Sequence, residues 1–330
     1  MNKALAFPNS RPDQYLPLTG EPEFKADIHL SLSQPDNSVN LSDLGYSAKD
    51  VATCESTFAY CTAFRVLSDE GVRVMKETCQ KIYSNRNSST GTGANRLGSY
   101  ARGAGYRSTF IRDFCDSPEL AEHISRISRV SLVRHSVPAV ACGINYAPDD
   151  ITKAVDTWHV DSVSFDMVMM LSDPSLIKGG EFQIFKGTKE QGQDLLGISG
   201  EEGKDAQLPS ERIETLAFPA AGYGFLQQGN MIFHRACRLL EKADRITMVP
   251  SFEVMPATAK DATNSVNMSS WEDPGIVPEL ARHELRRASA RLQELLCDVC
   301  LSDDAASLVT RIDTALASLI EFKQNLNNKK

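Results

Sequence analysis

Eight short β-rich segments follow one another between residues 139 and 254, and they constrain the fold of this 330-residue chain more than any other feature. The segments are AVACGINYA, DTWHVDSV, DMVMMLSD, GEFQIFKG, RIETLAF, YGFLQQG, MIFHRAC and RITMVPSFEV. Runs of this length, several of them separated by Gly, Pro, Asp or Lys turns, are typical of strands in an antiparallel sheet. Eight such strands predict a mainly β core folded as a jelly roll, the cupin-like double-stranded β-helix, with helical additions.

The sequence on either side of this core differs from it in composition. Residues 1–50 are rich in Pro, Ser, Asn and Asp and predict an irregular N-terminal arm. Residues 51–138 predict a helical part, in which Ser68 and Ser117 are the expected N-caps and residues 87–106 form a glycine-rich loop. We place the catalytic core at residues 139–256 and a C-terminal helical extension at residues 257–330.

The extension contains two helical patterns with periodic leucines and otherwise charged faces. Such helices need an apolar surface to cover. Packing against the barrel is the default expectation, and a homodimer contact through the C-terminal helices is the alternative.

Charge and hydropathy exclude several classes of protein. The net charge of −8 and the lack of a basic stripe argue against a nucleic-acid partner. No window approaches 18 continuous apolar residues, so no membrane span is expected. The first 20 residues lack the apolar segment of a signal peptide. The eight scattered cysteines are therefore expected to be reduced thiols in a cytoplasmic protein.

A metal site is predicted from three residues of the core. If residues 158–162 form a strand, His159 and Asp161 point to the same face. His234, 73 residues after Asp161, lies in a later strand and is the candidate third ligand. Two imidazoles and one carboxylate on one side of a metal form the facial triad of non-haem Fe(II) oxygenases. The alternative is that His159 is a core histidine and Asp161 a turn residue.

An arginine follows the triad at a short distance. Arg245 lies 11 residues after His234 and shares a strand face with Thr247. A guanidinium and a hydroxyl together can hold a terminal carboxylate. The alternative is a surface ion pair of Arg245 with Asp244 or Glu241. Three other histidines, at positions 123, 135 and 283, show no ligand pattern.

These motifs, taken in order, resemble those of a known family. The pattern His159-x-Asp161, GGEF at residues 179–182, GNMIFH ending at His234, and Arg245-x-Thr247 is similar to that of the Fe(II)/2-oxoglutarate-dependent dioxygenases. The resemblance covers roughly residues 140 to 254. The flanking helices look compatible with its phytanoyl-CoA or prolyl hydroxylase-like branches, and no motif selects one.

The resemblance implies a set of roles and a chemistry. His159, Asp161 and His234 would bind Fe(II), and Arg245 with Thr247 would bind the distal carboxylate of 2-oxoglutarate. With O2 as co-substrate, the usual outcome is hydroxylation of a C–H bond of a small molecule, such as an amino acid or a specialised metabolite. Halogenating members of the family replace the carboxylate ligand with a small residue, so Asp161 favours hydroxylation.

Five further residues are candidates for contact with the substrate. Arg102 and Arg107 lie at the end of the glycine-rich loop and could grip an anionic group, although solvated surface arginines are common. Asn145 and Tyr146 lie on the first predicted core strand and could line the pocket. Trp158 is either a pocket wall or a core residue.

Two alternatives to the oxygenase interpretation remain. One is a cupin-type metalloenzyme that does not use 2-oxoglutarate, which the role of Arg245 would distinguish. The other is a non-catalytic jelly-roll binding protein, which the ability to bind Fe(II) would distinguish.

Overall fold

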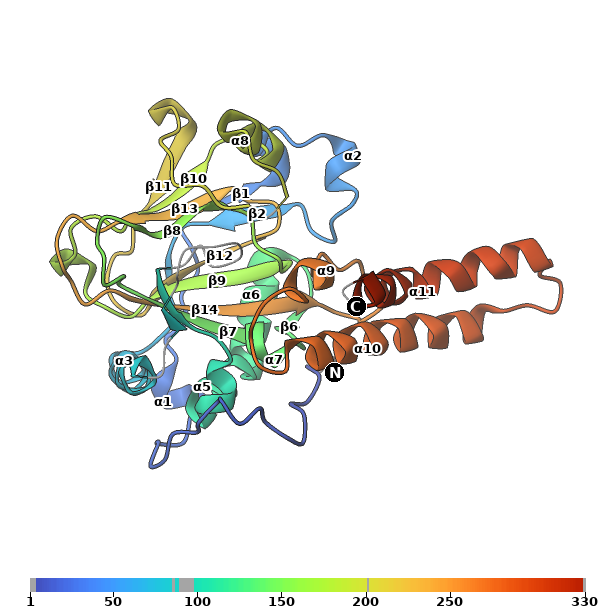
Figure 1. Ribbon diagram of the computed structural model, residues 1–330, viewed down its shortest axis with the longest axis horizontal. Helices are drawn as coiled ribbons and strands as arrows, with labels where there is room; N and C mark the ends of the chain where they lie inside the picture. The colour runs from blue at the N-terminus through green and yellow to red at the C-terminus, as the bar shows by residue number, and fades with distance from the viewer. Residues whose placement is uncertain (1–3, 85–86, 89–97, 201, 329–330) are drawn as a thin grey trace.

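Two antiparallel sheets stacked on each other form the body of the protein, as the computed structural model shows (Figure 1). The structure describes residues 4–84, 87–88, 98–200 and 202–328. The larger sheet follows the order β1 (Ser38–Asn40), β2 (Phe58–Cys61), β12 (Tyr223–Gln227), β9 (Phe165–Met170), β14 (Ile246–Val254), β7 (Cys142–Tyr146), β5 (Ser99–Ala101) and β4 (Asn87–Ser88). The smaller sheet follows the order β11 (Ile213–Leu216), β10 (Phe182–Phe185), β13 (His234–Arg238) and β8 (Ala154–His159).

All eight strands predicted from the sequence are present, as β7 to β14. Along the chain these strands pass repeatedly from one sheet to the other: β7, β9, β12 and β14 belong to the larger sheet and the other four to the smaller. The prediction of a mainly β core with helical additions is therefore confirmed. The first strand is shorter than expected, because a turn of helix, α7 (Pro138–Ala141), occupies the beginning of its segment.

The sequence before the core contributes strands as well as helices. The two expected helices are α3 (Asp69–Tyr83) and α6 (Pro118–Ser128), and the Ser68 and Ser117 hydroxyls cap them as predicted. A further helix, α5 (Thr109–Cys115), was not predicted. The strands β2, β4 and β5 widen the larger sheet, while β3 (Phe64–Arg65) and β6 (Leu132–Arg134) pair with β12 and β14. These strands have only two to four residues, which is too short for a periodic pattern to be recognised.

The N-terminal arm is mostly irregular and packs on the body. Its described residues form only short elements: α1 (Ala26–His29), the strand β1, the 3₁₀ turn η1 (Leu41–Leu44) and the start of α2 (Ala48–Val51). The Arg134 guanidinium donates to the Leu5 carbonyl oxygen (2.6 Å) and lies over the Phe7 ring, which ties the start of the arm to β6. The division of the chain into arm, helical part, core and extension stays a prediction.

Further short elements connect the strands of the core. They are η2 (Pro174–Leu176), α8 (Lys189–Leu196) and η3 (Ser210–Arg212), while α4 (Ala104–Arg107) lies before the core, between β5 and α5. In the described part of the chain, no helix is long and apolar enough to cross a lipid bilayer.

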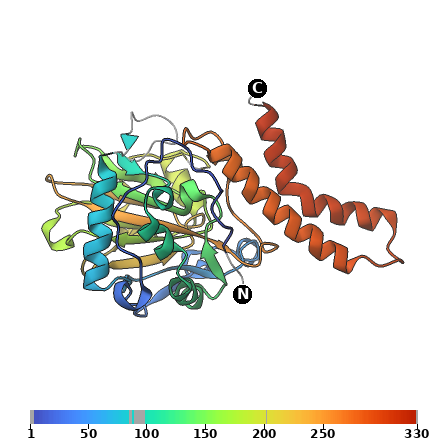
Figure 2. The ribbon, with the colours of Figure 1, turned by 90° about the horizontal axis from the view of Figure 1, so that it is seen from below.

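The C-terminal extension forms a helical hairpin that projects away from the two sheets (Figures 1 and 2). After α9 (Ser265–Met268), the hairpin consists of α10 (Ile276–Asp298) and α11 (Ala305–Asn328). The default expectation that these helices pack against the barrel is wrong for the outer part of the hairpin, where Leu292 and Leu296 are exposed. Only the first half of α10 and the end of α11, through Phe322, are buried against the body.

Candidate metal centre

The three predicted metal ligands meet at the edge of the smaller sheet. His159 is the last residue of β8 and His234 the first residue of β13, and the two are direct partners in the antiparallel ladder. The expectation that Asp161 lies on the same strand as His159 is wrong, because β8 ends at His159. The Asp161 carboxylate instead reaches the histidines from the following bend, where the Asp161 N–H donates to the Gly229 carbonyl oxygen (3.0 Å).

Backbone carbonyl groups determine which nitrogen of each histidine faces the centre. His159 Nδ1 lies 2.6 Å from the Thr157 carbonyl oxygen, and His234 Nδ1 lies 2.9 Å from the Ile232 carbonyl oxygen. A carbonyl oxygen only accepts, so each Nδ1 carries a hydrogen and each Nε2 presents a lone pair. This arrangement of a backbone partner behind the ring is the one that orients metal-binding histidines.

The two lone pairs converge on the carboxylate. His159 Nε2 is 3.4 Å from Asp161 Oδ1, and His234 Nε2 is 3.3 Å from Asp161 Oδ2. One ligand atom from each of the three residues lies within 4.8 Å of the others. Two neutral imidazoles and one carboxylate with adjacent open positions fit Fe(II), so the residues present match the predicted group.

Gln227 and Gly229, which the sequence analysis missed, hold the Asp161 side chain in place. The Gln227 side-chain nitrogen lies 3.0 Å from Asp166 Oδ1 and 3.4 Å from Asp161 Oδ2, so one amide links the two carboxylates. Gly229 lies so close that a Cβ there would stand 2.6 Å from Asp161 Oδ2 and 2.1 Å from Asp166 Oδ2. Asp166 was missed as well, although a charged residue inside the apolar run FDMVMM is unusual and could have indicated it. Nothing in the sequence pointed to Gln227.

Arg245 and Thr247 line the same cavity as the triad. This cavity has a volume of about 120 Å³ and lies between the two sheets. The Arg245 side chain is 1% exposed, and its hydrogen bonds go to the Gly180 carbonyl oxygen (3.2 Å) and Thr247 Oγ1 (3.4 Å). Within the residues that the structure describes, Arg245 forms no ion pair. Burial lowers the pKa of Arg245 to about 10, which leaves the guanidinium charged at neutral pH.

The alternative surface partners of Arg245 are engaged elsewhere. Asp244 forms an ion pair with Lys76 (2.8 Å), and Glu241 forms one with Lys178 (3.0 Å). Both hydrogen-bond partners of the buried Arg245 guanidinium, a carbonyl oxygen and a hydroxyl oxygen, are neutral. A buried charge with such partners favours the binding of an anionic ligand. The geometry therefore brings a guanidinium that is suited to a carboxylate and three side chains that are suited to a metal ion into one cavity.

The five candidate substrate residues separate into two groups. Arg102 and Asn145 line the cavity. The Arg102 guanidinium pairs with Asp273 and lies 3.7 Å from the centroid of the Trp271 ring, which also lines the cavity. The glycine-rich loop before Arg102 was interpreted as a flap, but residues 89–97 of it lie outside the described residues.

Arg107, Tyr146 and Trp158 are not part of the cavity lining. Arg107 is buried beside the ring of Tyr15 (5.2 Å). The Tyr146 hydroxyl donates to the Cys79 carbonyl oxygen of α3 (2.7 Å), on the outer side of the larger sheet. The Trp158 ring packs in an apolar cluster, and its Nε1 donates to the Ala206 carbonyl oxygen (3.0 Å). Trp158 is thus a core residue, which was one of its two interpretations.

Comparison with known proteins identifies similar sequences and folds. The family model described as Halogenase D matches residues 46–272. No curated protein matches the chain. Among solved structures, the chain is similar to the non-heme alpha-ketoglutarate-dependent epimerase SnoN from nogalamycin biosynthesis, with 12% identity, a TM-score of 0.44 and coverage of 66% of this chain and 87% of SnoN.

Two further solved structures show a likeness of the same order. The carbocyclase SnoK from nogalamycin biosynthesis has 14% identity and a TM-score of 0.37, over 66% of this chain and 86% of SnoK. EvdO2 from Micromonospora carbonacea var. aurantiaca, in complex with 2-oxoglutarate, has 13% identity and a TM-score of 0.38, over 69% of this chain and 94% of EvdO2. All three likenesses are distant.

Proposed function

The chain belongs to the Halogenase D family, and on that premise we propose that it is an Fe(II)- and 2-oxoglutarate-dependent oxygenase of a small molecule. The eight core strands, which pass repeatedly from one sheet to the other, support the double-stranded β-helix as its fold. His159, Asp161 and His234 would hold the iron, and Arg245 with Thr247 would hold the distal carboxylate of 2-oxoglutarate.

The observation that carries this proposal is the buried charge of Arg245 in the cavity of the triad. A diacid can place one carboxylate near the triad and the other on Arg245, which satisfies both ends. Gly180 supports this position, since a Cβ there would stand 2.9 Å from Arg245 Nε. The guanidinium is therefore held by its surroundings before any ligand arrives.

When bound, iron, 2-oxoglutarate and O2 supply the oxidation. For a hydroxylation, substrate R–H, O2 and 2-oxoglutarate give R–OH, succinate and CO2, so that one oxygen atom enters each organic product. The protein would position the reactants: the triad would hold the metal, and Arg245 would hold 2-oxoglutarate. The enclosed cavity would limit the access of water to them.

Asp161 favours oxygenation over halogenation despite the name of the family. A halide bound to the metal would need the position that this carboxylate takes. The Asp161 side chain is held by Gln227, and its N–H is bonded to Gly229, so it is not free to move aside. The substrate that we propose is a small molecule, such as an amino acid or another small metabolite.

Arg102 and Asn145 are the residues we propose for contact with this substrate. Arg102 is held between Trp271 and the ring of Tyr100, so its guanidinium presents a fixed edge to the cavity. An anionic group of the substrate could pair with that edge. Arg107 has no comparable access, because it does not line the cavity.

The test is the affinity for 2-oxoglutarate, measured by anaerobic titration calorimetry on Fe(II)-loaded protein. Arg245→Gln should weaken binding by about 30-fold or more, because removing one partner of a buried charge pair costs about 2–5 kcal/mol. Arg238→Gln, at an exposed position of β13, changes the net charge equally and should have no effect.

Each alternative function predicts a different result in the same experiment. Wild-type affinity for 2-oxoglutarate in Arg245→Gln would favour a cupin-type metalloenzyme that does not use this co-substrate. Failure of the wild-type protein to take up Fe(II) anaerobically would favour a non-catalytic binding protein. A screen for metabolites that stimulate succinate formation would then identify the substrate.

We also propose that the projecting hairpin pairs with a second copy of the chain. Leu285, Leu292, Leu296, Leu316 and Leu319 line an apolar groove between α10 and α11. Two such hairpins can bury these rows against each other as a four-helix bundle. Sedimentation should show a dimer for the wild type and a monomer for Leu292→Glu, and a monomeric wild type at micromolar concentration would contradict the pairing.

A further inference from the structure

The segment from Asp261 to His283 forms a strap that leaves the end of β14 and returns to it. The strap contains α9, Trp271, Asp273 and the first two turns of α10. Asp261 and His283 at its two ends are joined by a contact of 2.8 Å between Asp261 Oδ2 and His283 Nε2. The strap is therefore a loop whose two ends are joined at its base by the ion pair of Asp261 with His283.

One part of the strap braces the bend that carries Asp161. The Asn264 N–H donates to the Ser162 carbonyl oxygen (2.9 Å), and the Asn267 side-chain amide donates to Ser162 Oγ (3.2 Å). The Ala262 N–H donates to Ser164 Oγ (3.1 Å). Because this bend belongs to neither sheet, these three hydrogen bonds hold it in addition to the hydrogen bond of Asp161 with Gly229.

A second part of the strap reaches the cavity itself. Trp271 lines the cavity and covers the guanidinium of Arg102, which pairs with Asp273. Both the carboxylate ligand and the candidate substrate arginine thus depend on the position of the strap.

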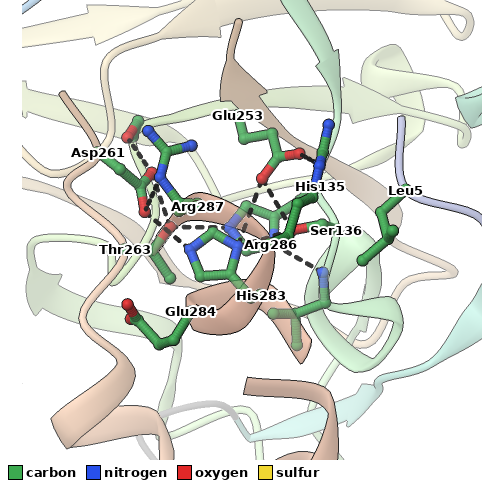
Figure 3. A network of polar contacts seen from close by, with 12 residues as sticks. Leu5, His135, Ser136, Glu253, Asp261, Thr263, His283, Glu284, Arg286 and Arg287 are labelled. Carbon is green, nitrogen blue, oxygen red and sulfur yellow. Dashed lines mark hydrogen bonds and ion pairs between the residues drawn. The ribbon is translucent and has the colours of Figure 1, made fainter. Parts of the chain in front are cut away.

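The base of the strap is a buried network of charges around His283 (Figure 3). His283 Nδ1 lies 2.6 Å from Ser136 Oγ, and the Ser136 hydroxyl donates to Glu253 Oε2 (2.8 Å). Because that hydroxyl hydrogen is directed at Glu253, Ser136 Oγ must accept from His283. With Nε2 also donating, to Asp261, both ring nitrogens carry hydrogens, and His283 is an imidazolium between two buried carboxylates.

Other charged and titratable groups complete this network. They are Arg286, which pairs with Glu253, Arg287, whose Nε is 3.7 Å from Asp261, Glu284, which accepts from the Ser265 hydroxyl, and His135, whose ring stacks on that of His283 at 5.3 Å. Burial alone would lower the pKa of His283, but the charges and hydrogen bonds of Asp261 and Glu253 outweigh it and raise the pKa to about 9.

This cluster is not a second metal site, although His135, Glu253 and His283 lie close enough for one. His135 Nδ1 accepts from the Val137 N–H (3.2 Å), and its Nε2 is bonded to Thr263 Oγ1 (2.9 Å), so no lone pair of the ring remains. The nearby cations Arg286 and Arg287 would also repel a metal ion. The network is therefore a group of buried ion pairs that hold the two ends of the strap together.

We propose that the strap is a positioning element of the active-site cavity and that His283 is the positioning residue that fastens it. His283 acts on the site through the strap, since it touches neither the triad nor Arg102. The proposal has two consequences. Loss of the imidazolium should loosen Trp271, and it should weaken metal binding through the unbraced bend. The second consequence rests on the proposed function, whereas the first does not.

The first test measures how accessible Trp271 is to acrylamide. The protein has two tryptophans, and Trp158 is 0% exposed, so quenching reports mainly Trp271 and the Trp271→Phe variant supplies the background. In the wild type, quenching should rise as the pH passes through about 9, where His283 loses its proton. In His283→Gln, quenching should already be high near pH 7, with no further rise.

The control is His123→Gln, which changes another buried histidine, on α6 and away from the strap. Its quenching curve should match that of the wild type. If His283→Gln, folded by circular dichroism, shows wild-type quenching at every pH, the fastening role is refuted regardless of what the protein catalyses.

The second test separates the strap from the stability of the fold. Asn267→Ala removes one brace on Ser162 and leaves the ionic network intact, so it stays informative even where His283→Gln does not fold. With Co(II) as the probe, affinity should fall by about two- to tenfold, the range that corresponds to one hydrogen bond. Unchanged Co(II) affinity in Asn267→Ala would overturn the positioning role. Failure of the wild type to bind Co(II) would instead overturn the proposed function.

Discussion

Gly229→Ala should displace the Asp161 carboxylate, the proposed third ligand, without contacting His159 or His234. The new Cβ would stand 2.6 Å from Asp161 Oδ2 and 2.1 Å from Asp166 Oδ2, whereas real Cβ contacts essentially never fall under 3.0 Å. The two oxygens must therefore retreat by at least 3.0 − 2.6 = 0.4 Å and 3.0 − 2.1 = 0.9 Å. Both belong to short side chains that Gln227 links, so neither can swing away freely.

The size of the effect follows from the tolerance of a metal site. Ligand positions are tolerated within about 0.2 Å, and the displacement of Asp161 exceeds this by twofold or more. We expect Fe(II) affinity to fall by about 10- to 100-fold, as it does when the groups that orient a ligand are changed. Overpacking should also lower the free energy of unfolding by about 1–3 kcal/mol.

The assay is anaerobic calorimetry with Fe(II), with thermal unfolding in parallel. Gly143→Ala is the matched control, because Gly143 lines the same cavity and its Cβ would meet no atom within 4 Å. That variant should bind iron as the wild type does. If Gly229→Ala and Gly143→Ala bind iron equally well, the close approach of Gly229 to Asp161 does not control the ligand.

Three further predictions concern the triad and the stability of the protein. His234→Ala should abolish metal binding and turnover while circular dichroism shows a retained fold; turnover with wild-type metal content would mean that another residue is the ligand. Asp161→Gly should lose oxygenation without gaining a halogenated product, because no shaped anion pocket replaces the carboxylate, and mass spectrometry of the products with chloride present checks this. Burial raises the pKa of Glu279 to about 7. A raised carboxyl pKa makes the folded state lose stability as the pH rises from about 4.5 through about 7, by about 3 kcal/mol in total. Glu279→Gln should remove this dependence in unfolding experiments between about pH 5 and pH 8, and an unchanged slope would assign it to another group.

The sequence allowed the core strands and the position of the triad to be predicted because both depend on local spacing. Strand alternation also explains why two of the candidate substrate residues, Tyr146 and Trp158, do not line the cavity. Successive side chains on a strand point to opposite faces. On β7, Asn145 lines the cavity, so its neighbour Tyr146 faces α3 on the other side of the sheet. On β8, His159 points into the cavity, so its neighbour Trp158 faces the apolar cluster.

Contacts between distant segments could not be predicted from spacing. Ser136 and His283 are 147 positions apart, and Gln227 and Asp161 are 66 apart. Nothing local to His283 distinguishes it from a surface residue of an amphipathic helix, which is how its segment was interpreted. Likewise, the leucine pattern of α10 and α11 showed that an apolar face exists but not which surface covers it.

The location of the three proposed ligands has a consequence for how such a site can evolve. His159 and His234 are paired across the ladder of the smaller sheet, so any change to them disturbs a strand pair. Asp161 lies one step outside that ladder, in a bend held by side chains and by the strap. Under the proposed assignment, the residue that would decide which anion shares the metal is thus the one whose replacement disturbs the strand pairing least, and a change of chemistry there would also need an anion pocket built from the residues around the bend.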